Sequence, residues 1–128
     1  MQIHQSAEDY LETILMLNQR MGRVRSIDVV NELGYTKASV SIAMKKLREN
    51  GYIAVDGEGN LTLLEPGREI AERIYSRHRL LTHFFVQLGV DEEVAAEDAC
   101  KAEHILSEQT LKKIREYALL HDAQDSVK

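Results

Sequence analysis

One short stretch, residues 99–106, brings together three side chains that can bind a metal ion. It reads ACKAEHIL, with Cys100, Glu103 and His104 at positions i, i+3 and i+4. On a helix these offsets share one face, so a thiol, a carboxylate and an imidazole would project from the same side. The same pattern also suits a buried cysteine, which behaves as a small hydrophobic residue, beside a solvated charge. The stretch is therefore either a metal site or part of an ordinary amphipathic helix.

Three further candidate ligands lie earlier in the chain. Asp9 and Glu12 are three residues apart and would share a helix face; the alternative is that they stabilise the positive end of the helix dipole and lie on a solvated face. His78 lies in the segment SRHRLL, where a half-buried polar residue is the alternative interpretation. The sequence has no CxxC or HExxH motif, so it does not indicate a closed zinc site or a metalloprotease.

Composition limits the class of protein. The chain has 128 residues, of which 44% are hydrophobic, and this suits one compact domain or a domain with a dimerisation arm. No apolar run is long enough for a membrane helix, and the start MQIHQSAEDYLE lacks the pattern of a signal peptide. The single cysteine cannot form an internal disulfide. We therefore expect a cytoplasmic protein that has no membrane partner.

The charge is distributed unevenly along the chain. The net charge of −5 by itself argues against binding to nucleic acid. Residues 20–51, however, carry seven basic and three acidic side chains, so the remaining residues together have a net charge of −9. A basic segment on an acidic body is typical of a DNA-binding protein with a second function that attracts cations.

Three helices and a hairpin are predicted in the N-terminal half. Apolar periodicity predicts helices over residues 6–20, 26–34 and 37–50. Ser26 can cap the second helix, which would turn Ile27, Val30 and Leu33 inward, and Gly34 can end it. The turn cluster DGEGN separates two β-prone segments, 52–55 and 61–64, so a hairpin should follow the third helix. This order of elements is typical of a winged helix-turn-helix.

The C-terminal half is predicted to be helical. A long helix should begin at Pro66 and end near residue 88, followed by helices over about 92–106 and 107–120 that Asp91 and Ser107 can cap. We therefore predict a mainly α protein with a small β-hairpin. Its winged helix-turn-helix domain would occupy residues 1–65, and a helical metal-binding and dimerisation domain residues 66–128. A homodimer is expected because the apolar residues beyond about 90 exceed what one small domain needs to cover: Val94, Ile105, Leu106, Leu111 and Ile114.

The basic segment coincides with the predicted helix-turn-helix. The second helix of this motif lies in the major groove of double-stranded DNA, with its N-terminal residues at base edges. Small hydroxyl side chains can approach the bases there, and lysines farther along suit the phosphates. The alternative is a basic helix that is only solvated, and the acids Asp56 and Glu58 at the hairpin tip would repel phosphates. The predicted DNA-contacting residues are Arg25, Thr36, Lys37, Ala38, Ser39, Ser41, Lys45 and Lys46.

Over essentially its whole length the chain resembles the diphtheria-toxin-repressor family of metal-dependent transcriptional regulators. AEDYLETILML is similar to the first helix of the family, YSRHRLLTHFFVQLGVDEE to its long linking helix, and EDACKAEHILSE to its metal-binding helix. The likeness is strongest to the short manganese-transport-regulator branch, which lacks a C-terminal SH3-like domain. The resemblance implies a homodimer that binds a divalent metal, then a palindromic operator, and represses metal-uptake genes.

The same resemblance implies which residues bind the metal: Asp9, Glu12, His78, Cys100, Glu103 and His104. Manganese-type members usually have glutamate where this chain has Cys100, and iron-type members have methionine where it has Asp9. The partners of the iron-type second site are replaced here by Thr82 and Ala96. The chain thus mixes two patterns, and we expect Fe²⁺ or Mn²⁺ as the physiological ion. Zn²⁺, Co²⁺ and Ni²⁺ can bind the same donor atoms.

Two other functions are considered from the same residues. A metal-independent winged-helix regulator could use Cys100 as a redox sensor. A metalloenzyme could use Glu103 as a general base, but the sequence offers no second acid–base pair and no substrate-binding glycine-rich loop. We therefore predict that the protein is not an enzyme.

Overall fold

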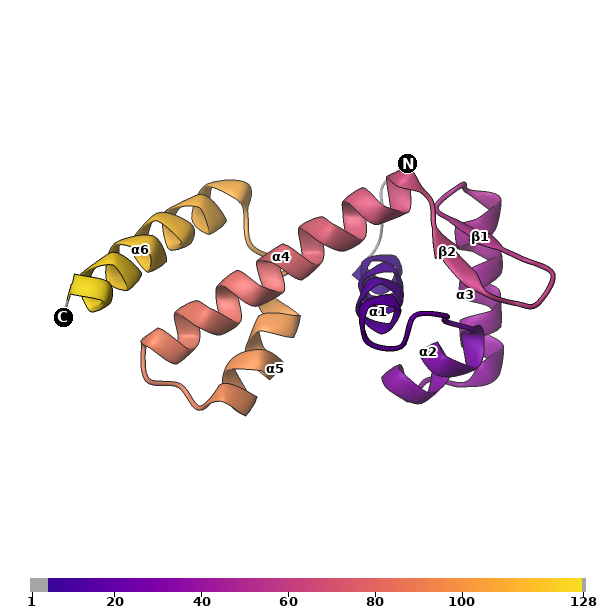
Figure 1. The fold of residues 1–128 in the computed structure, drawn as a ribbon, viewed down its shortest axis with the longest axis horizontal. Helices are drawn as coiled ribbons and strands as arrows, with labels where there is room; N and C mark the ends of the chain where they lie inside the picture. The colour runs from indigo at the N-terminus through magenta and orange to yellow at the C-terminus, as the bar shows by residue number, and fades with distance from the viewer. Residues whose placement is uncertain (1–4, 128) are drawn as a thin grey trace. The chain divides into compact units, whose positions relative to one another are not determined.

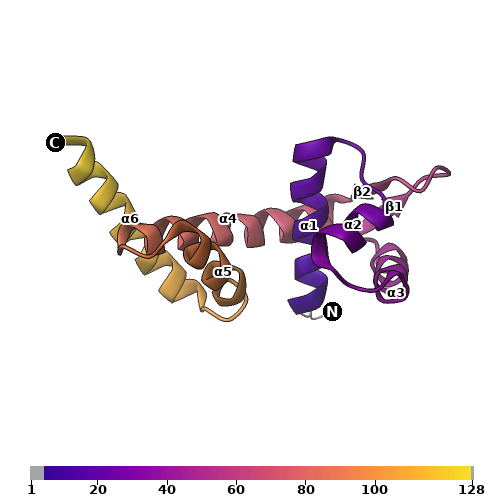
Figure 2. The ribbon, with the colours of Figure 1, turned by 90° about the horizontal axis from the view of Figure 1, so that it is seen from below.

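The computed structural model describes the backbone of residues 5–127 and the side chains of residues 5–122. Within that range the chain forms six helices and one two-stranded hairpin (Figures 1 and 2). The chain forms two compact units. The first ends at Arg73 and the second begins at Ile74, so the boundary lies inside the long helix α4 (Glu65–Gln87). The prediction of a mainly α protein with a small hairpin is confirmed.

The first unit is a winged helix-turn-helix, as predicted. It begins with α1 (Gln5–Met21), whose Leu11 and Ile14 are fully buried. The next two helices pack against each other, and the hairpin lies beside the second of them (Figure 1). The two strands are antiparallel, with Ala54 opposite Thr62. The bounds of these four elements are α2 (Ser26–Leu33), α3 (Lys37–Glu49), β1 (Ile53–Val55) and β2 (Leu61–Leu63).

The turn between α2 and α3 has the predicted stop but not the predicted start. Gly34 adopts a left-handed conformation, with φ of 72°, and its N–H donates to the carbonyl of Val30 at 2.9 Å. This geometry favours glycine and ends α2. The prediction that Ser26 caps α2 is wrong, because Arg25 occupies the cap position and its N–H donates to Asp28 Oδ2 at 2.9 Å.

The inward face of α2 also differs from the prediction. Val29 is the fully buried residue of this helix, whereas Ile27 is 43% exposed. Val30 and Leu33, which were also predicted to face inward, are partly buried, so the buried side of α2 is centred closer to Val29 than predicted and leaves Ile27 outside it.

Asp56 organises the tip of the hairpin. Its Oδ1 accepts the backbone N–H groups of Glu58 and Asn60, both at 2.9 Å, and its Oδ2 accepts from Asn60 Nδ2 at 3.0 Å. The hydrogen bond from the backbone of Asn60 is the main reason that the pKa of Asp56 is lowered. The acid therefore remains charged while it shapes the turn, and the weak attraction of phosphates to the wing tip stays a prediction.

Gly67 allows α4 to start close to the preceding chain. A β-carbon at this position would lie 2.2 Å from the carbonyl oxygen of Tyr52, closer than any real side chain comes. The same carbonyl accepts the N–H of Leu64 at 3.0 Å, so it cannot simply move away. Only glycine fits here, and it holds the first turn of α4 against the end of the helix-turn-helix.

The second unit consists of the rest of α4 with α5 (Glu92–Ala102) and α6 (Glu108–Val127). One residue from each helix forms its buried core: Leu81, Ala99 and Leu111. Ser107 caps α6 as predicted, because its Oγ accepts the N–H of Thr110 at 3.2 Å. Asp91 precedes α5, but its side chain makes no capping hydrogen bond.

The apolar residues predicted for a dimer contact fall into two groups. Val94 and Ile105 are 46% and 76% exposed, so they are available to a partner. Leu111 is buried in the core of its own unit, and Leu106 and Ile114 pack against that core. The prediction of a dimer surface is therefore wrong for Leu106, Leu111 and Ile114. Helical periodicity shows that a face is apolar, but it does not show whether that face packs within the same chain or against a second chain.

Candidate functional site

The candidate site is built around Glu103, whose side chain is completely buried. Because α5 ends at Ala102, Glu103 lies at its C-cap and His104 lies in the turn that follows. The helix predicted over residues 92–106 is therefore four residues too long, and His104 lies beyond its end, whereas Glu103 keeps helical backbone angles and donates its N–H to the carbonyl of Ala99 at 2.9 Å. Leu106 packs against the core of the unit and Ser107 caps the next helix, so the chain must leave α5 before them.

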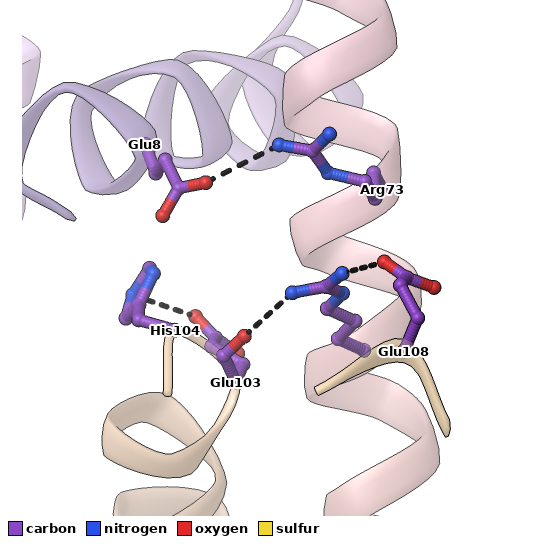
Figure 3. Close-up of polar contacts among 6 residues, drawn as sticks. Glu8, Arg73, Glu103, His104 and Glu108 are labelled. Carbon is purple, nitrogen blue, oxygen red and sulfur yellow. Dashed lines mark hydrogen bonds and ion pairs between the residues drawn. The ribbon is translucent and has the colours of Figure 1, made fainter. Parts of the chain in front are cut away.

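Two imidazoles flank the buried carboxylate. Nδ1 of His78, from α4, lies 3.1 Å from Glu103 Oε2. Nε2 of His104 lies 3.4 Å from Glu103 Oε1 (Figure 3). The side chain of His104 is 2% exposed and that of His78 23% exposed. Sequence reasoning selected all three residues, and the structure brings them together.

This arrangement suits a divalent cation. Burying a carboxylate is costly unless it is paired or coordinates a metal. Glu103 Oε1 is buried, and among the described residues its contact with His104 Nε2 at 3.4 Å lacks hydrogen-bond geometry. Imidazole nitrogen and carboxylate oxygen are donors that Mn²⁺, Fe²⁺ and Zn²⁺ accept. The residues of the second unit therefore fit a metal ion of this kind.

The carboxylates of α1 lie in the first unit. Glu12 is 6% exposed, and Asp9, three residues earlier, is partly buried on the same helix. Their neighbour Glu8 pairs with Arg73 Nη2 at 3.3 Å (Figure 3). Two acids that are this well covered on one helix differ from the solvated face that was the alternative interpretation.

Cys100 differs from Glu103 and His104 in its surroundings. It lies on the last turns of α5 and is exposed.

Thr82, at one of the positions of the iron-type second site, donates its hydroxyl to the carbonyl of His78 at 2.8 Å. That hydroxyl therefore fixes the backbone of a candidate ligand, and the chain offers no imidazole or carboxylate at that position.

All eight predicted DNA-contacting residues are exposed, from Arg25 to Lys46. Six of them lie on α3, which also exposes Ile42 to 58%, whereas Arg25 precedes α2 and Thr36 precedes α3. Thr36 occupies the N-cap of α3, where its Oγ1 accepts the N–H of Ser39 at 3.1 Å and donates to Ser39 Oγ at 2.8 Å. Both hydroxyls therefore stabilise the start of the helix, and this role was not recognised in the sequence.

The cap leads to a prediction about stability. Thr36→Ala should lower the free energy of unfolding by about 1 kcal/mol, because it leaves the N–H of Ser39 without its side-chain acceptor. Urea unfolding of the metal-free protein measures this. Ser41→Ala is the matched control, since it removes an exposed hydroxyl beyond the first turn of the same helix and should change stability by less than about 0.5 kcal/mol. Equal losses in the two variants would contradict the capping role.

Comparison with known proteins assigns the two halves of the chain. Residues 2–61 match the iron dependent repressor N-terminal DNA binding domain, and residues 64–120 match the iron dependent repressor metal binding and dimerisation domain. No helix among the described residues is both long and apolar enough to cross a membrane.

Relatives of known sequence cover nearly the whole chain. An uncharacterised HTH-type transcriptional regulator of Methanocaldococcus jannaschii is 35% identical over 113 residues, which are 87% of this chain and 90% of that protein. The HTH-type transcriptional regulator MntR of Bacillus subtilis is 32% identical over 123 residues, covering 96% of this chain and 87% of that protein.

Solved structures share the fold over about half of their own length. A manganese-dependent transcriptional repressor in complex with manganese is 28% identical, with a TM-score of 0.80, and the match covers 88% of this chain and 52% of that one. The structure of the manganese regulator SloR, at 24% identity and a TM-score of 0.76, covers 91% of this chain and 54% of the other. At 24% identity, the similarity to SloR supports the assignment of the fold and nothing further.

Proposed function

Because this chain belongs to the iron-dependent repressor family, also known as the diphtheria-toxin-repressor family, we infer that it is a DNA-binding transcriptional repressor that a divalent metal ion activates. The observation that carries the proposal most directly is the buried carboxylate of Glu103 between two imidazoles. The proposed targets are genes for the uptake of iron or manganese. The proposed site of action is the cytoplasm, and the family is one of regulators rather than enzymes.

The proposed ligand set contains oxygen, nitrogen and sulfur donors. Its members are Asp9, Glu12, His78, Cys100, Glu103 and His104. A bound divalent cation would supply the positive charge that offsets the carboxylates and a thiolate. Mn²⁺ and Fe²⁺ are the proposed physiological ions, because carboxylates favour Mn²⁺ and the thiolate favours a softer ion. A repressor of the same fold that was solved in complex with manganese supports the choice of Mn²⁺.

The proposed ligands come from both functional domains. Asp9 and Glu12 belong to the helix that begins the DNA-binding domain, proposed as residues 1–65. The other four belong to the metal-binding and dimerisation domain, proposed as residues 66–128. Holding residues of both domains in one ligand set would restrict their relative motion. In a homodimer this would favour a spacing of the two α3 helices of about 34–36 Å, one turn of DNA, which suits a palindromic operator.

The redox alternative for Cys100 gains nothing from the comparisons, because the matching family is defined by metal binding. A metalloenzyme with Glu103 as general base also finds no support among relatives that are named as transcriptional regulators.

Operator binding in the presence of different metals tests the proposal. A preferred DNA site is first selected from a random pool with Mn²⁺, and its affinity is then measured with Fe²⁺, Mn²⁺, Zn²⁺ and Co²⁺ under reducing conditions, together with metal stoichiometry. We expect binding to the selected palindrome to require metal and to be strongest with Fe²⁺ or Mn²⁺. Equal affinity in the presence of a chelator would refute metal activation.

Lys45 provides a prediction for the DNA contact. Together with Arg48 and Ser41 it lines a surface pocket of about 250 Å³ next to α3, which suits a phosphate group. Lys45→Ala should weaken binding to all sequences similarly and reduce the slope of log affinity against log salt by roughly one unit. Lys112→Ala, an exposed lysine of α6, is the control and should leave the slope unchanged. A loss confined to the specific operator would mean that Lys45 reads bases instead.

A further inference from the structure

Arg77 makes two polar contacts beside the candidate metal centre that the proposed function does not use. It lies on α4, one residue before His78, and its side chain is only 14% exposed. Its Nη1 donates to the backbone carbonyl of Glu103 at 3.2 Å, and its Nη2 pairs with the carboxylate of Glu108. A guanidinium this well covered is rare in proteins unless it is paired.

The two contacts hold both ends of one turn. Glu103 is the C-cap of α5, and Glu108 is the first residue of α6. The last carbonyls of a helix lack partners within the helix, and a cation near them is favourable. One side chain of α4 thus fixes the five residues that connect α5 to α6, and the buried side chains of Glu103 and His104 start from this connection.

Arg77 leaves the carboxylate oxygens of Glu103 available to bind a metal ion. Arg77 binds the main-chain oxygen of Glu103, so the carboxylate stays directed at His78 and His104. A positive charge next to a cation site would weaken metal binding by repulsion. The carboxylate of Glu108 offsets that charge. The arrangement therefore provides rigidity without opposing the charge of a bound metal.

We propose that Arg77 is a positioning residue for the metal centre: it holds the turn of residues 103–107 in the conformation that binds metal before the ion arrives. This inference rests on the proposed function, because it assumes that Glu103 and His104 are ligands. Outer-shell partners that orient ligands typically contribute about 10–100-fold to metal affinity. Arg77 acts on a ligand in this way through its backbone.

Metal titration of three variants of the metal-free, 128-residue chain tests the role of Arg77. Co²⁺ is the probe, because its binding is read both by calorimetry and by its absorption spectrum. Arg77→Ala should lower Co²⁺ affinity about 10–100-fold and shift the absorption bands of the saturated site. Arg77→Lys keeps the charge but not the planar fork, so it should restore part of the affinity and of the spectrum. Arg79→Ala, which removes an exposed arginine on the other side of His78, is the matched control and should match the wild type.

The outcomes separate this inference from the proposed function. If Arg77→Ala and Arg79→Ala bind Co²⁺ with equal affinity and equal spectra, Arg77 has no positioning role, while the wild-type response to metal still stands. If the wild type binds no Co²⁺, the proposed function fails and the role of Arg77 fails with it. If Arg77→Ala does not fold, Arg77→Lys decides, because reduced affinity in a folded protein supports the inference and wild-type affinity overturns it.

Discussion

Replacing Glu103 by glutamine should abolish metal-dependent operator binding without unfolding the protein. Glutamine has nearly the same shape, and a neutral amide costs less to bury than a carboxylate, so the fully covered position of Glu103 can accept it. The lost charge, however, removes a central ligand between His78 and His104. We expect metal affinity to fall by more than the ~10–100-fold that loss of an outer-shell partner costs.

Thermal unfolding with and without Mn²⁺ measures this directly. At a metal concentration 100 times the dissociation constant, the wild type should gain about 2.7 kcal/mol, because the ion binds only the folded state. Glu103→Gln should lose this gain while its metal-free stability stays within about 1 kcal/mol of the wild type. Glu97→Gln, the same substitution at an exposed position of α5, should keep the full gain. If Glu103→Gln is still stabilised by Mn²⁺, the carboxylate is not a ligand.

Much of the DNA-binding unit could be predicted because its signals are local. Gly34 ends α2 through its own backbone conformation, and the DGEGN cluster forces a turn between two short strands. Such signals act within a few residues and need no information from the rest of the chain. The cap of α2 was the exception. Ser26 and Arg25 compete for one position, and the acceptor that decides it is the side chain of Asp28.

The candidate site was harder to predict because tertiary packing determines it. The apolar periodicity predicts that α5 extends to residue 106. In the structure the helix ends at Ala102, because the chain turns there and brings Leu106 against the core of the second unit. A helix face therefore does not account for the closeness of Glu103 and His104, although the sequence identified both. The role of Arg77 had no sequence signal, because its partners Glu103 and Glu108 lie 26 and 31 residues away.

Cys100 should determine which metal the protein prefers. Cys100 lies on α5, three residues before the buried Glu103, and its thiolate is the one soft donor in the proposed ligand set. Cys100→Ala should lower metal affinity at least as much as the ~10–100-fold loss of an outer-shell partner, while the fold and dimer persist. Cys100→Glu should keep the Mn²⁺ response and lose relative preference for softer ions such as Zn²⁺, because all remaining ligands are then oxygen or nitrogen.

The pH dependence of Mn²⁺ binding gives a second measure of the same ligand. A thiol must lose its proton to bind metal, and an ordinary thiol has a pKa near ~8.5. Wild-type affinity should therefore rise from about pH 6 to about pH 8, with up to one more proton released per metal than in Cys100→Glu, whose carboxylate is already ionised in this range. Calorimetry in two buffers of different ionisation enthalpy counts these protons. If wild type, Cys100→Ala and Cys100→Glu release the same number of protons and rank the metals alike, Cys100 is not a ligand, and the other five residues bind the ion alone.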